Sequence, residues 1–246
     1  MSLLLKIPGL RIVARLHEYI TRLAPLEEFD DYDAYWQERA VDEGSTRELD
    51  RFKVIAGLIQ EQESVLDIGC GDASFQQYLA RVKPGCKSLG LDASSEAVRV
   101  AQEHGCATKV IDTDLRLLEQ VGCDWDVVTL MEVLEHIPDA ESVMRQVIEL
   151  RPRRIFVTIP NVGCLKHRFR LMFGGRFPIT TIVYHMREHL RFWTVKDFEQ
   201  WAETFGLEVC SVQGQFSFGD DMVKFAVKKF PAYFAPQVIY ELRSRR

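Results

Sequence analysis

The sequence of 246 residues predicts an α/β protein with a doubly wound, Rossmann-like sheet and helices on both faces. Three observations favour this fold. Short apolar runs typical of buried parallel strands recur at 65–68, 88–92, 124–130 and 154–161. Segments with helical spacing follow these runs. The first run ends in a glycine turn, which is where such sheets bind nucleotide-like ligands.

The first strand–turn–helix unit follows an amphipathic helix expected at 47–60. The strand at 65–68 leads into Gly69 and Gly71, which allow a tight turn and let a ligand approach the backbone. A helix expected at 74–81 then directs its free N–H groups and the positive end of its dipole toward the same place. The unit is therefore predicted to bind a ligand at the carboxyl end of the sheet.

The charge at this turn limits which class of nucleotide-like ligand can bind there. Ser74 replaces the third glycine of the dinucleotide fingerprint, and Asp67 precedes the first glycine by two residues. A carboxylate there repels a pyrophosphate but suits an ammonium group, which S-adenosylmethionine carries. The stretch from Asp67 through Gly69 and Cys70 to Gly71 resembles motif I of class I S-adenosylmethionine-dependent methyltransferases. The resemblance implies that these four residues bind the cofactor. The alternative is a glycine turn in an ordinary α/β domain.

The next two strand ends supply further candidate cofactor residues. Asp92, with Ala93 beside it, lies 21 residues after Gly71, the usual place for a carboxylate that binds ribose hydroxyls. The alternative is an Asp that caps the following helix, expected at 94–104. After the third strand, at 109–115, the family places an acidic residue at the adenine amino group. Asp112 and Asp114 are both candidates, and we favour Asp114 because Leu115 can pack on the ring.

The fourth strand, next to the first in the family's sheet, runs into Met131 and the phrase Glu-Val-Leu-Glu-His-Ile-Pro-Asp at 132–139. This phrase resembles the loop of ubiquinone-biosynthesis methyltransferases, and we expect Met131 and Glu132 to line the cofactor site. Its Glu132, Glu135 and His136 would share one face of a helical turn. We predict His136 as the catalytic base or substrate orienter. The alternatives are a pocket wall and a divalent-metal site with His189 as a fourth ligand, as in small-RNA methyltransferases, but we expect no resident metal.

The remaining elements complete a seven-stranded sheet, mostly parallel, whose last strand is antiparallel in the family. Three further helices are expected: a short one at 116–121, one capped by Asp139, and one that begins with the capping box Thr194-x-x-Asp197 and ends at Gly206. Two further strands are expected at 207–212 and 237–242.

The insertion at 162–193 is longer than an ordinary connection and is basic and aromatic. It is predicted to be a lid that binds an acceptor of acidic or phosphate character, or else a solvated basic face that pairs with the acidic residues at 27–43. The sequence is expected to divide into a helical extension or cap at 1–46 and a methyltransferase domain at 47–246.

The extension has two parts. Residues 1–23 fit a basic amphipathic helix, which either lies on a membrane surface or, as is more common, covers an apolar edge of its own domain or of a partner subunit. Residues 24–48 are acidic and aromatic. Tyr35, Trp36 and Arg39 resemble the segment that closes over the cofactor in many such methyltransferases, and the alternative is an acidic linker.

The composition of the chain argues against several classes of protein function and location. The net charge of −5 argues against general nucleic-acid binding. The six cysteines are scattered without a C-x-x-C pair, so we do not expect a structural zinc site. Scattered thiols also suggest that the protein resides in a reducing compartment. The sequence shows no transmembrane run and no signal-peptide pattern, which favours a cytoplasmic location. A small-molecule acceptor is the expected partner, and homodimer formation is considered as well.

The resemblance covers residues 47–214. Within the class, the stretches at 159–163, 174–178 and 189–198 look most like the MetW-like group of methionine biosynthesis. The sequence therefore predicts a methyltransferase that acts on an oxygen or nitrogen of a small-molecule, sugar or lipid acceptor and releases S-adenosylhomocysteine. The alternative is a non-catalytic, S-adenosylmethionine-binding partner of a biosynthetic enzyme.

Overall fold

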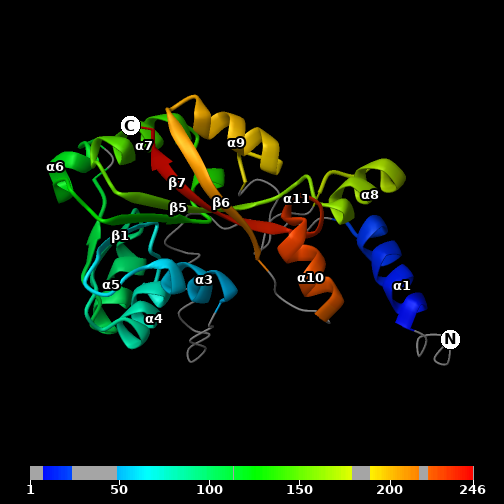
Figure 1. Cartoon of the computed structure of the whole chain (residues 1–246), viewed down its shortest axis with the longest axis horizontal. Coiled ribbons are helices and arrows are strands. Elements are labelled where there is room, and N and C mark those ends of the chain that lie inside the picture. The colour runs from blue at the N-terminus through cyan, green and yellow to red at the C-terminus, as the bar shows by residue number, and fades with distance from the viewer. Residues whose placement is uncertain (1–7, 24–48, 113, 179–188, 216–220, 246) are drawn as a thin grey trace.

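A single sheet of seven strands organises the protein. The computed structural model describes residues 8–23, 49–112, 114–178, 189–215 and 221–245. The strand order is β3-β2-β1-β4-β5-β7-β6. Figure 1 labels β1, β5, β6 and β7 of this sheet. Only β7 runs antiparallel to its neighbours β5 and β6, so the predicted mostly parallel sheet with an antiparallel last strand is confirmed. The strands are β1 (Ser64–Ile68), β2 (Lys87–Asp92), β3 (Thr108–Val110), β4 (Val127–Met131), β5 (Arg154–Pro160), β6 (Leu207–Gln215) and β7 (Gln237–Ser244).

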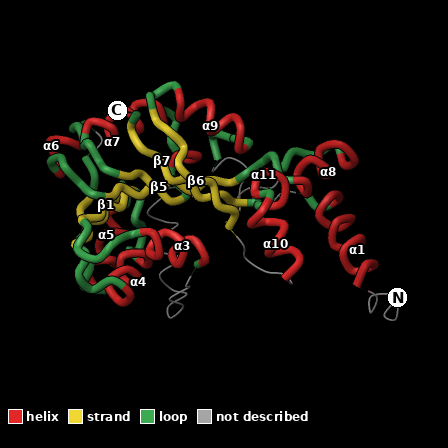
Figure 2. Tube along the Cα trace, viewed as in Figure 1, coloured by secondary structure: helices red, strands yellow, loops and turns green. Residues whose placement is uncertain are grey.

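Helices cover both faces of the sheet (Figure 2). One face packs against α3 and α4 through a core around Phe52, Ile55 and Phe75, and the other packs against α6, α7 and α9. The helices are α1 (Pro8–Thr21), α3 (Asp50–Leu58), α4 (Ser74–Val82), α5 (Ser95–Glu103), α6 (Leu117–Val121), α7 (Ala140–Glu149), α8 (Leu165–Gly174), α9 (Val195–Glu203), α10 (Asp221–Lys229) and α11 (Pro231–Phe234), with a 3₁₀ turn at Leu134–His136.

The predicted helix starts are confirmed by their caps. The carboxylate of Asp139 accepts from the N–H of Ser142 at 2.9 Å, which begins α7. Thr194 and Asp197 form the predicted capping box of α9. The strand bounds differ more. The third strand is three residues long, and β4 begins at Val127 rather than at 124.

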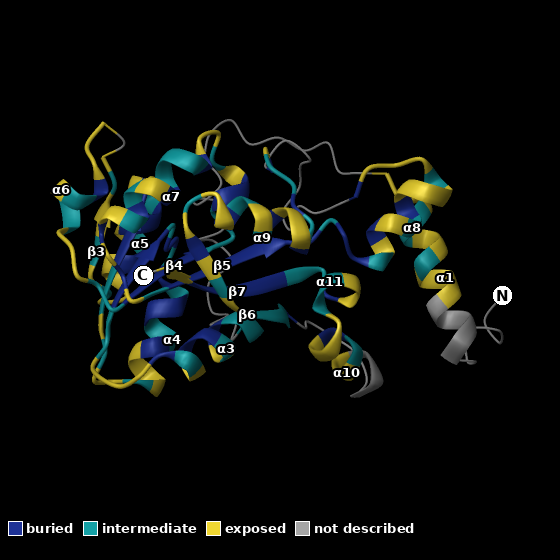
Figure 3. Cartoon of the chain, turned by 45° about the horizontal axis from the view of Figure 1, so that its top comes forward, coloured by how far each residue is buried: buried dark blue, intermediate teal, exposed yellow. Residues whose placement is uncertain are grey.

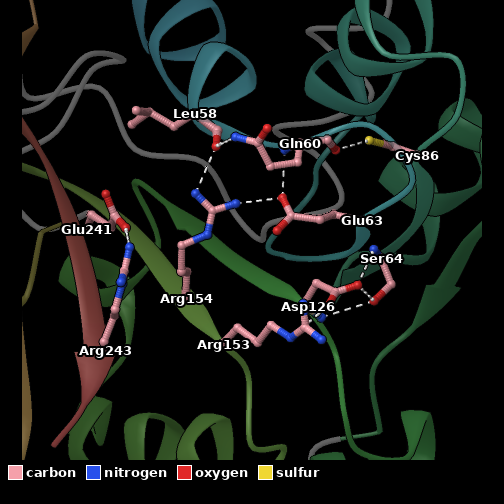
Figure 4. Close-up of polar contacts among 10 residues, drawn as sticks. All are labelled: Leu58, Gln60, Glu63, Ser64, Cys86, Asp126, Arg153, Arg154, Glu241 and Arg243. Carbon is pink, nitrogen blue, oxygen red and sulfur yellow. Dashed lines mark hydrogen bonds and ion pairs between the residues drawn. The ribbon is translucent and has the colours of Figure 1, made fainter.

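A polar cluster at the amino ends of the strands explains the late start of β4 (Figure 4). The carboxylate of Asp126 accepts from the backbone N–H and the hydroxyl of Ser64, at 2.9 and 3.0 Å, which aligns the starts of β1 and β4. Beside it, Arg154 pairs with Glu63 at 2.5 Å and donates to the carbonyl of Leu58 at 2.8 Å. These groups satisfy one another, so this edge of the sheet is structural.

The extension and the insertion are seen in part. In the extension, α1 packs against α8 of the insertion. The segments at 1–7, 24–48 and 179–188 lie outside the described residues, so the acidic-aromatic cap and the middle of the lid stay predictions, as does the domain division at 46. Among the helices that the structure describes, none is both long and apolar enough to cross a membrane.

Candidate functional site

The glycine turn after β1 joins the carboxyl ends of two neighbouring strands. The N–H groups of Gly69 and Cys70 donate to the carbonyl of Leu91 at 2.7 and 3.0 Å, and the N–H of Gly71 donates to the carboxylate of Asp92 at 2.8 Å. Gly69 and Gly71 have φ values of 71° and 55°, in the left-handed region that favours glycine. The predicted residues of the first two strand ends therefore meet at one place.

Gly69 also sets how closely this turn approaches the segment after β4. A Cβ atom at Gly69 would lie 2.4 Å from Cγ2 of Val133, inside the distance that carbon atoms tolerate. The absence of a side chain at Gly69 thus brings the first motif and the Glu-Val-Leu-Glu-His phrase into direct packing. The sequence predicted that both motifs line one site, but not that Val133 makes the contact between them.

We expect Gly69→Ala to lower the free energy of unfolding by about 1–3 kcal/mol. The reason is that alanine is strained at a positive φ and that its Cβ would displace Val133. The substitution should also weaken binding of S-adenosylhomocysteine. Gly57→Ala is the matched control, since a Cβ there meets nothing within 4 Å and the position lies in α3. That control should be neutral or stabilising. Urea unfolding and calorimetry measure both effects, and equal behaviour of the two variants would contradict the packing argument.

Asp67 carries an unsatisfied buried oxygen at this edge. Its side chain is 1% exposed, and Oδ1 accepts from the hydroxyl of Thr129 at 2.6 Å. No described residue hydrogen-bonds to Oδ2. Burial raises the pKa of Asp67 to about 7, the charge of Asp92 adds to the rise, and the Thr129 hydrogen bond opposes it. An approaching ammonium group would satisfy Oδ2. Thr129, directly across from Asp67 in the β1–β4 register, was missed by sequence reasoning although its strand position signals the contact.

Asp92 braces the turn with both carboxylate oxygens. Oδ2 accepts from Gly71, and Oδ1 accepts from the N–H of Ser94 at 2.9 Å. The cap of α5 is Ser94, whose hydroxyl accepts from Ala97, so Asp92 is not the helix cap that was the alternative. A carboxylate can accept more than one hydrogen bond at each oxygen, which is the chemistry that a ribose diol requires. Ala93 is exposed beside it.

The candidate adenine-binding residues after β3 lie at the protein surface. Asp114, Leu115 and Asp112 are exposed, and the carboxylate of Asp112 accepts from the N–H of Asp114 at 2.9 Å. The side-chain amide of Gln120 holds the same loop, because its oxygen accepts from the N–H of Asp112 and its nitrogen donates to the carbonyl of Asp112. Since the carboxylate of Asp112 already holds its own turn, the adenine assignment to Asp114 stays the preferred prediction.

The prediction that Glu132, Glu135 and His136 share one helical face is wrong. Glu132, next to half-buried Met131, has a φ of 57°, which turns the chain out of β4. Its carboxylate accepts from the hydroxyl of Thr158 at 2.9 Å and from the side-chain amide of Gln237 at 2.7 Å. These partners on β5 and β7 hold Glu132 toward the sheet, and it precedes the 3₁₀ turn that contains the other two residues.

The cluster that forms instead contains Glu135, His136 and His189. One ligand atom from each lies within 4.8 Å of the others, and the two imidazole rings meet edge to face with centroids 4.8 Å apart. Glu135 is fully buried, and neither of its carboxylate oxygens has a hydrogen-bond partner among the described residues. Burial and the nearby Glu132 raise the pKa of Glu135 well above its usual value.

This donor set fits a divalent cation. A buried carboxylate without hydrogen bonds needs either a proton or a counter-charge. Burial, together with neighbouring His136, lowers the pKa of His189 to about 3, so its imidazole is neutral, as a metal ligand must be. Two nitrogens and a carboxylate oxygen suit ions such as Zn²⁺ or Mn²⁺. The ligand set differs from the predicted one because it omits Glu132.

His189 reaches this place because the end of the insertion is tied to the segment after β4. The N–H of Leu190 donates to the carbonyl of Glu135 at 2.7 Å. Arg191 pairs with Glu141 of α7 at 2.6 Å and donates to the carbonyl of Ile137 at 3.2 Å. The sequence predicted His189 as a candidate ligand and Arg191 only as one of the basic residues of the insertion, so the tie from Arg191 to Glu141 was not predicted.

A doubly wound seven-stranded sheet with a glycine turn after β1 and strand-end carboxylates defines a class I S-adenosylmethionine-dependent methyltransferase fold. Residues 49–242 match the family described as methionine biosynthesis protein MetW, and the chain belongs to that family. The resemblance found in the sequence is thereby confirmed.

Relatives and solved structures agree with this class. The chain is 31% identical over 168 residues to a ubiquinone biosynthesis O-methyltransferase of Cupriavidus pinatubonensis, a match that spans 65% of each chain. A protein of the same description from Pseudoalteromonas translucida is 30% identical over 159 residues, or 62% of this chain and 66% of the relative. The matches thus span about two thirds of those relatives.

Two solved structures share the fold. One is the magnesium protoporphyrin IX methyltransferase of Synechocystis with bound S-adenosylhomocysteine, with a TM-score of 0.56 and 17% identity over 98% of this chain and 96% of that one. The other is the methyltransferase domain of bacterial CtHen1-C, with a TM-score of 0.57 and 18% identity over 80% of this chain and 98% of that one.

Proposed function

We propose that the chain is an S-adenosylmethionine-dependent methyltransferase that acts on an oxygen or nitrogen of a small-molecule, sugar or lipid acceptor. One observation carries the proposal: the glycine turn, the unpartnered oxygen of Asp67 and the carboxylate of Asp92 lie together at the carboxyl ends of β1 and β2. This arrangement offers an acceptor for an ammonium group and acceptors for ribose hydroxyls, at a turn whose glycines carry no side chain.

The remaining predicted contacts complete the cofactor site. Met131 ends β4 and Glu132 follows it, next to β1, while Asp114 and Leu115 follow β3, next to β2. The proposed cofactor would therefore lie across four adjacent strand ends, with the amino acid part near β1 and β4 and the adenine near β3. Such sheets bind their ligands outside these strand ends.

The reaction needs alignment and, for a hydroxyl acceptor, removal of a proton. The acceptor oxygen attacks the sulfonium methyl in line, the carbon–sulfur bond breaks, and S-adenosylhomocysteine leaves as a neutral thioether. The acceptor proton passes to a base, and exposed His136, whose ring meets that of His189, is the proposed one. The curated relatives are described as O-methyltransferases, which supports oxygen as the acceptor atom.

A divalent ion at Glu135, His136 and His189 would polarise the acceptor hydroxyl and ease its deprotonation. His136 would then be a ligand, and the ion would bind the carboxylate of Glu135, whose oxygens have no hydrogen-bond partner among the described residues. Residues of the chain would still orient the acceptor, and Asp67 and Asp92 would keep the roles proposed above.

The second candidate is an S-adenosylmethionine-binding partner of a biosynthetic enzyme, which the match to the methionine-biosynthesis family favours. Labelled S-adenosylmethionine separates the two. The enzyme proposal expects tight binding and transfer of the labelled methyl to an acceptor fraction of a cell extract. Binding without transfer to any fraction favours the partner, and failure to bind rejects both.

Asp92→Ala should weaken S-adenosylhomocysteine binding by about 1–3 kcal/mol, the usual effect of leaving buried polar groups unpaired. Because Asp92 also holds Gly71 and Ser94, thermal stability should fall in the same variant. Asp139→Ala is the matched control: it removes the cap of α7 and lowers stability by about 1 kcal/mol but lies outside the cofactor contacts. Unchanged affinity of Asp92→Ala in calorimetry would reject the ribose assignment.

A further inference from the structure

The helix α8 is oriented with its polar side inward. His167 and Arg170 are 2% and 1% exposed, whereas Leu171, Met172 and Phe173 are 54%, 65% and 67% exposed. A surface helix of a globular protein normally shows the opposite arrangement. The apolar face of α8 therefore points away from its own domain.

The inward polar face is fully used, which fixes the orientation of the helix. The guanidinium of Arg170 donates to the carbonyls of Tyr19, Arg22 and Phe177, the latter two at 2.7 and 2.8 Å. It thereby satisfies carbonyls at the end of α1 that a helix leaves unpaired. The hydroxyl of Tyr19 also hydrogen-bonds to His167. Turning α8 over would break these contacts, so its apolar side stays outward.

Most of the large exposed apolar residues in the part of the chain that the structure describes belong to elements at this end. We call the group α1, α8, α10 and α11 the apolar arm; α8 contacts α1 and α11, and α11 contacts α10 (Figure 1). Figure 3 shows exposed residues along α8 and α10, in contrast to the buried strands. The large exposed apolar side chains of the arm and its adjoining residues are Val13, Leu23, Leu171, Met172, Phe173, Phe177, Phe225, Phe230, Tyr233 and Phe234. Four others among the described residues are Val82, Val110, Leu115 and Leu190.

Basic residues frame these apolar side chains. Besides the inward Arg170, residues 165–178 contain Lys166, Arg168 and Arg176 and no acid, in a chain with a net charge of −5. The helix α10 begins with Asp221, and residues 224–236 then contain three Lys and no acid. The ammonium of Lys229 lies 5.6 and 5.8 Å from the ring centres of Phe225 and Phe230, and Arg168 lies 5.4 Å from that of Tyr233. Aromatic rings with basic groups beside them are typical of the interface between lipid and water.

We propose that the apolar arm docks on an anionic phospholipid surface. The positive charge on an otherwise acidic protein complements phosphate head groups, and the outward Leu171, Met172 and Phe173 would enter the boundary of the acyl chains. A second copy fits less well, since its arm would carry the same positive charge. The hypothesis of membrane contact by residues 1–23 is thereby extended: α1 holds α8, and α8 supplies the apolar face. The contact is peripheral and independent of the proposed methyl transfer.

Sedimentation with vesicles tests this proposal on the full chain. Vesicles of phosphatidylcholine mixed with phosphatidylglycerol should bind the wild type at least ~10-fold more tightly than vesicles of phosphatidylcholine alone, and binding should fall as salt rises. The double variant Met172→Ser with Phe173→Ser should lose about tenfold or more of this affinity, and Lys228→Glu with Lys229→Glu should lose the preference for anionic lipid.

The control is Val82→Ser with Val110→Ser, which changes two exposed apolar residues outside the arm and should bind as the wild type does. Circular dichroism verifies that each variant is folded. Equal binding of folded wild type and Met172→Ser with Phe173→Ser would overturn the proposal. So would a dimer in vesicle-free solution that this double variant abolishes, because the face would then belong to a second copy.

Discussion

His136→Asn should lower the rate of methyl transfer by about 100-fold or more, with any acceptor that the wild type methylates, while leaving cofactor affinity nearly unchanged. The imidazole is exposed and lies next to His189, in the segment that follows β4, and we propose that it takes the acceptor proton. General-base catalysis contributes about 10²–10⁴ to a rate, and asparagine cannot accept the proton. The matched control is His104→Asn, an exposed histidine after α5 that contacts Gln77 and should keep full activity.

Chelation distinguishes the two roles open to His136. If it acts as a base alone, the wild-type rate should survive treatment with a chelator, and the pH profile of the rate should shift in His136→Asn. If it holds an ion, chelation should remove activity and Mn²⁺ or Zn²⁺ should restore it. Glu135→Gln should then lose bound metal, measured by elemental analysis, together with activity. Full activity of His136→Asn would reject both roles and leave this cluster as a pocket wall.

The sequence predicted best what local chemistry and strand order determine. The turn at Gly69 and Gly71 requires left-handed backbone, and glycine supplies it. Asp67 and Asp92 end neighbouring parallel strands, so their proximity follows once β1 and β2 are paired. The caps at Asp139 and Thr194 are determined by residues three positions apart. These features could be predicted because each depends on few contacts with residues that are distant in the sequence.

The features that were missed depend on partners far away in the chain. Glu132 leaves the expected helical face because Thr158 and Gln237, on β5 and β7, bind both of its oxygens. The polar side of α8 faces inward because Arg170 finds the carbonyls at the end of α1, roughly 150 residues earlier. No periodicity in either segment contains that information, and the sequence assigned no helix at α10 or α11.

Asp67 should give the protein a pH-dependent stability that Asp67→Asn removes. The folded pKa is about 7, raised chiefly by burial, whereas an unfolded Asp has a pKa near 3.8. Between these values the folded state binds the proton and the unfolded state does not, so the stabilisation is complete at acid pH and is lost as pH rises toward 7. Each pH unit in this window changes the free energy of unfolding by about 1.4 kcal/mol.

From about pH 5 to about pH 8 the wild type should therefore lose ~3 kcal/mol more than Asp67→Asn does. Glu132 and Glu135, whose pKa values are also raised by burial, contribute in the same direction but are present in both proteins, so the difference between them isolates Asp67. Urea unfolding at several pH values measures it, and Asp114→Asn, which changes an exposed carboxylate, is the matched control. Parallel curves for wild type and Asp67→Asn would mean that Asp67 is already ionised in the folded protein. The turn would then present a permanent negative charge, and an ammonium ligand would bind there without release of the Asp67 proton.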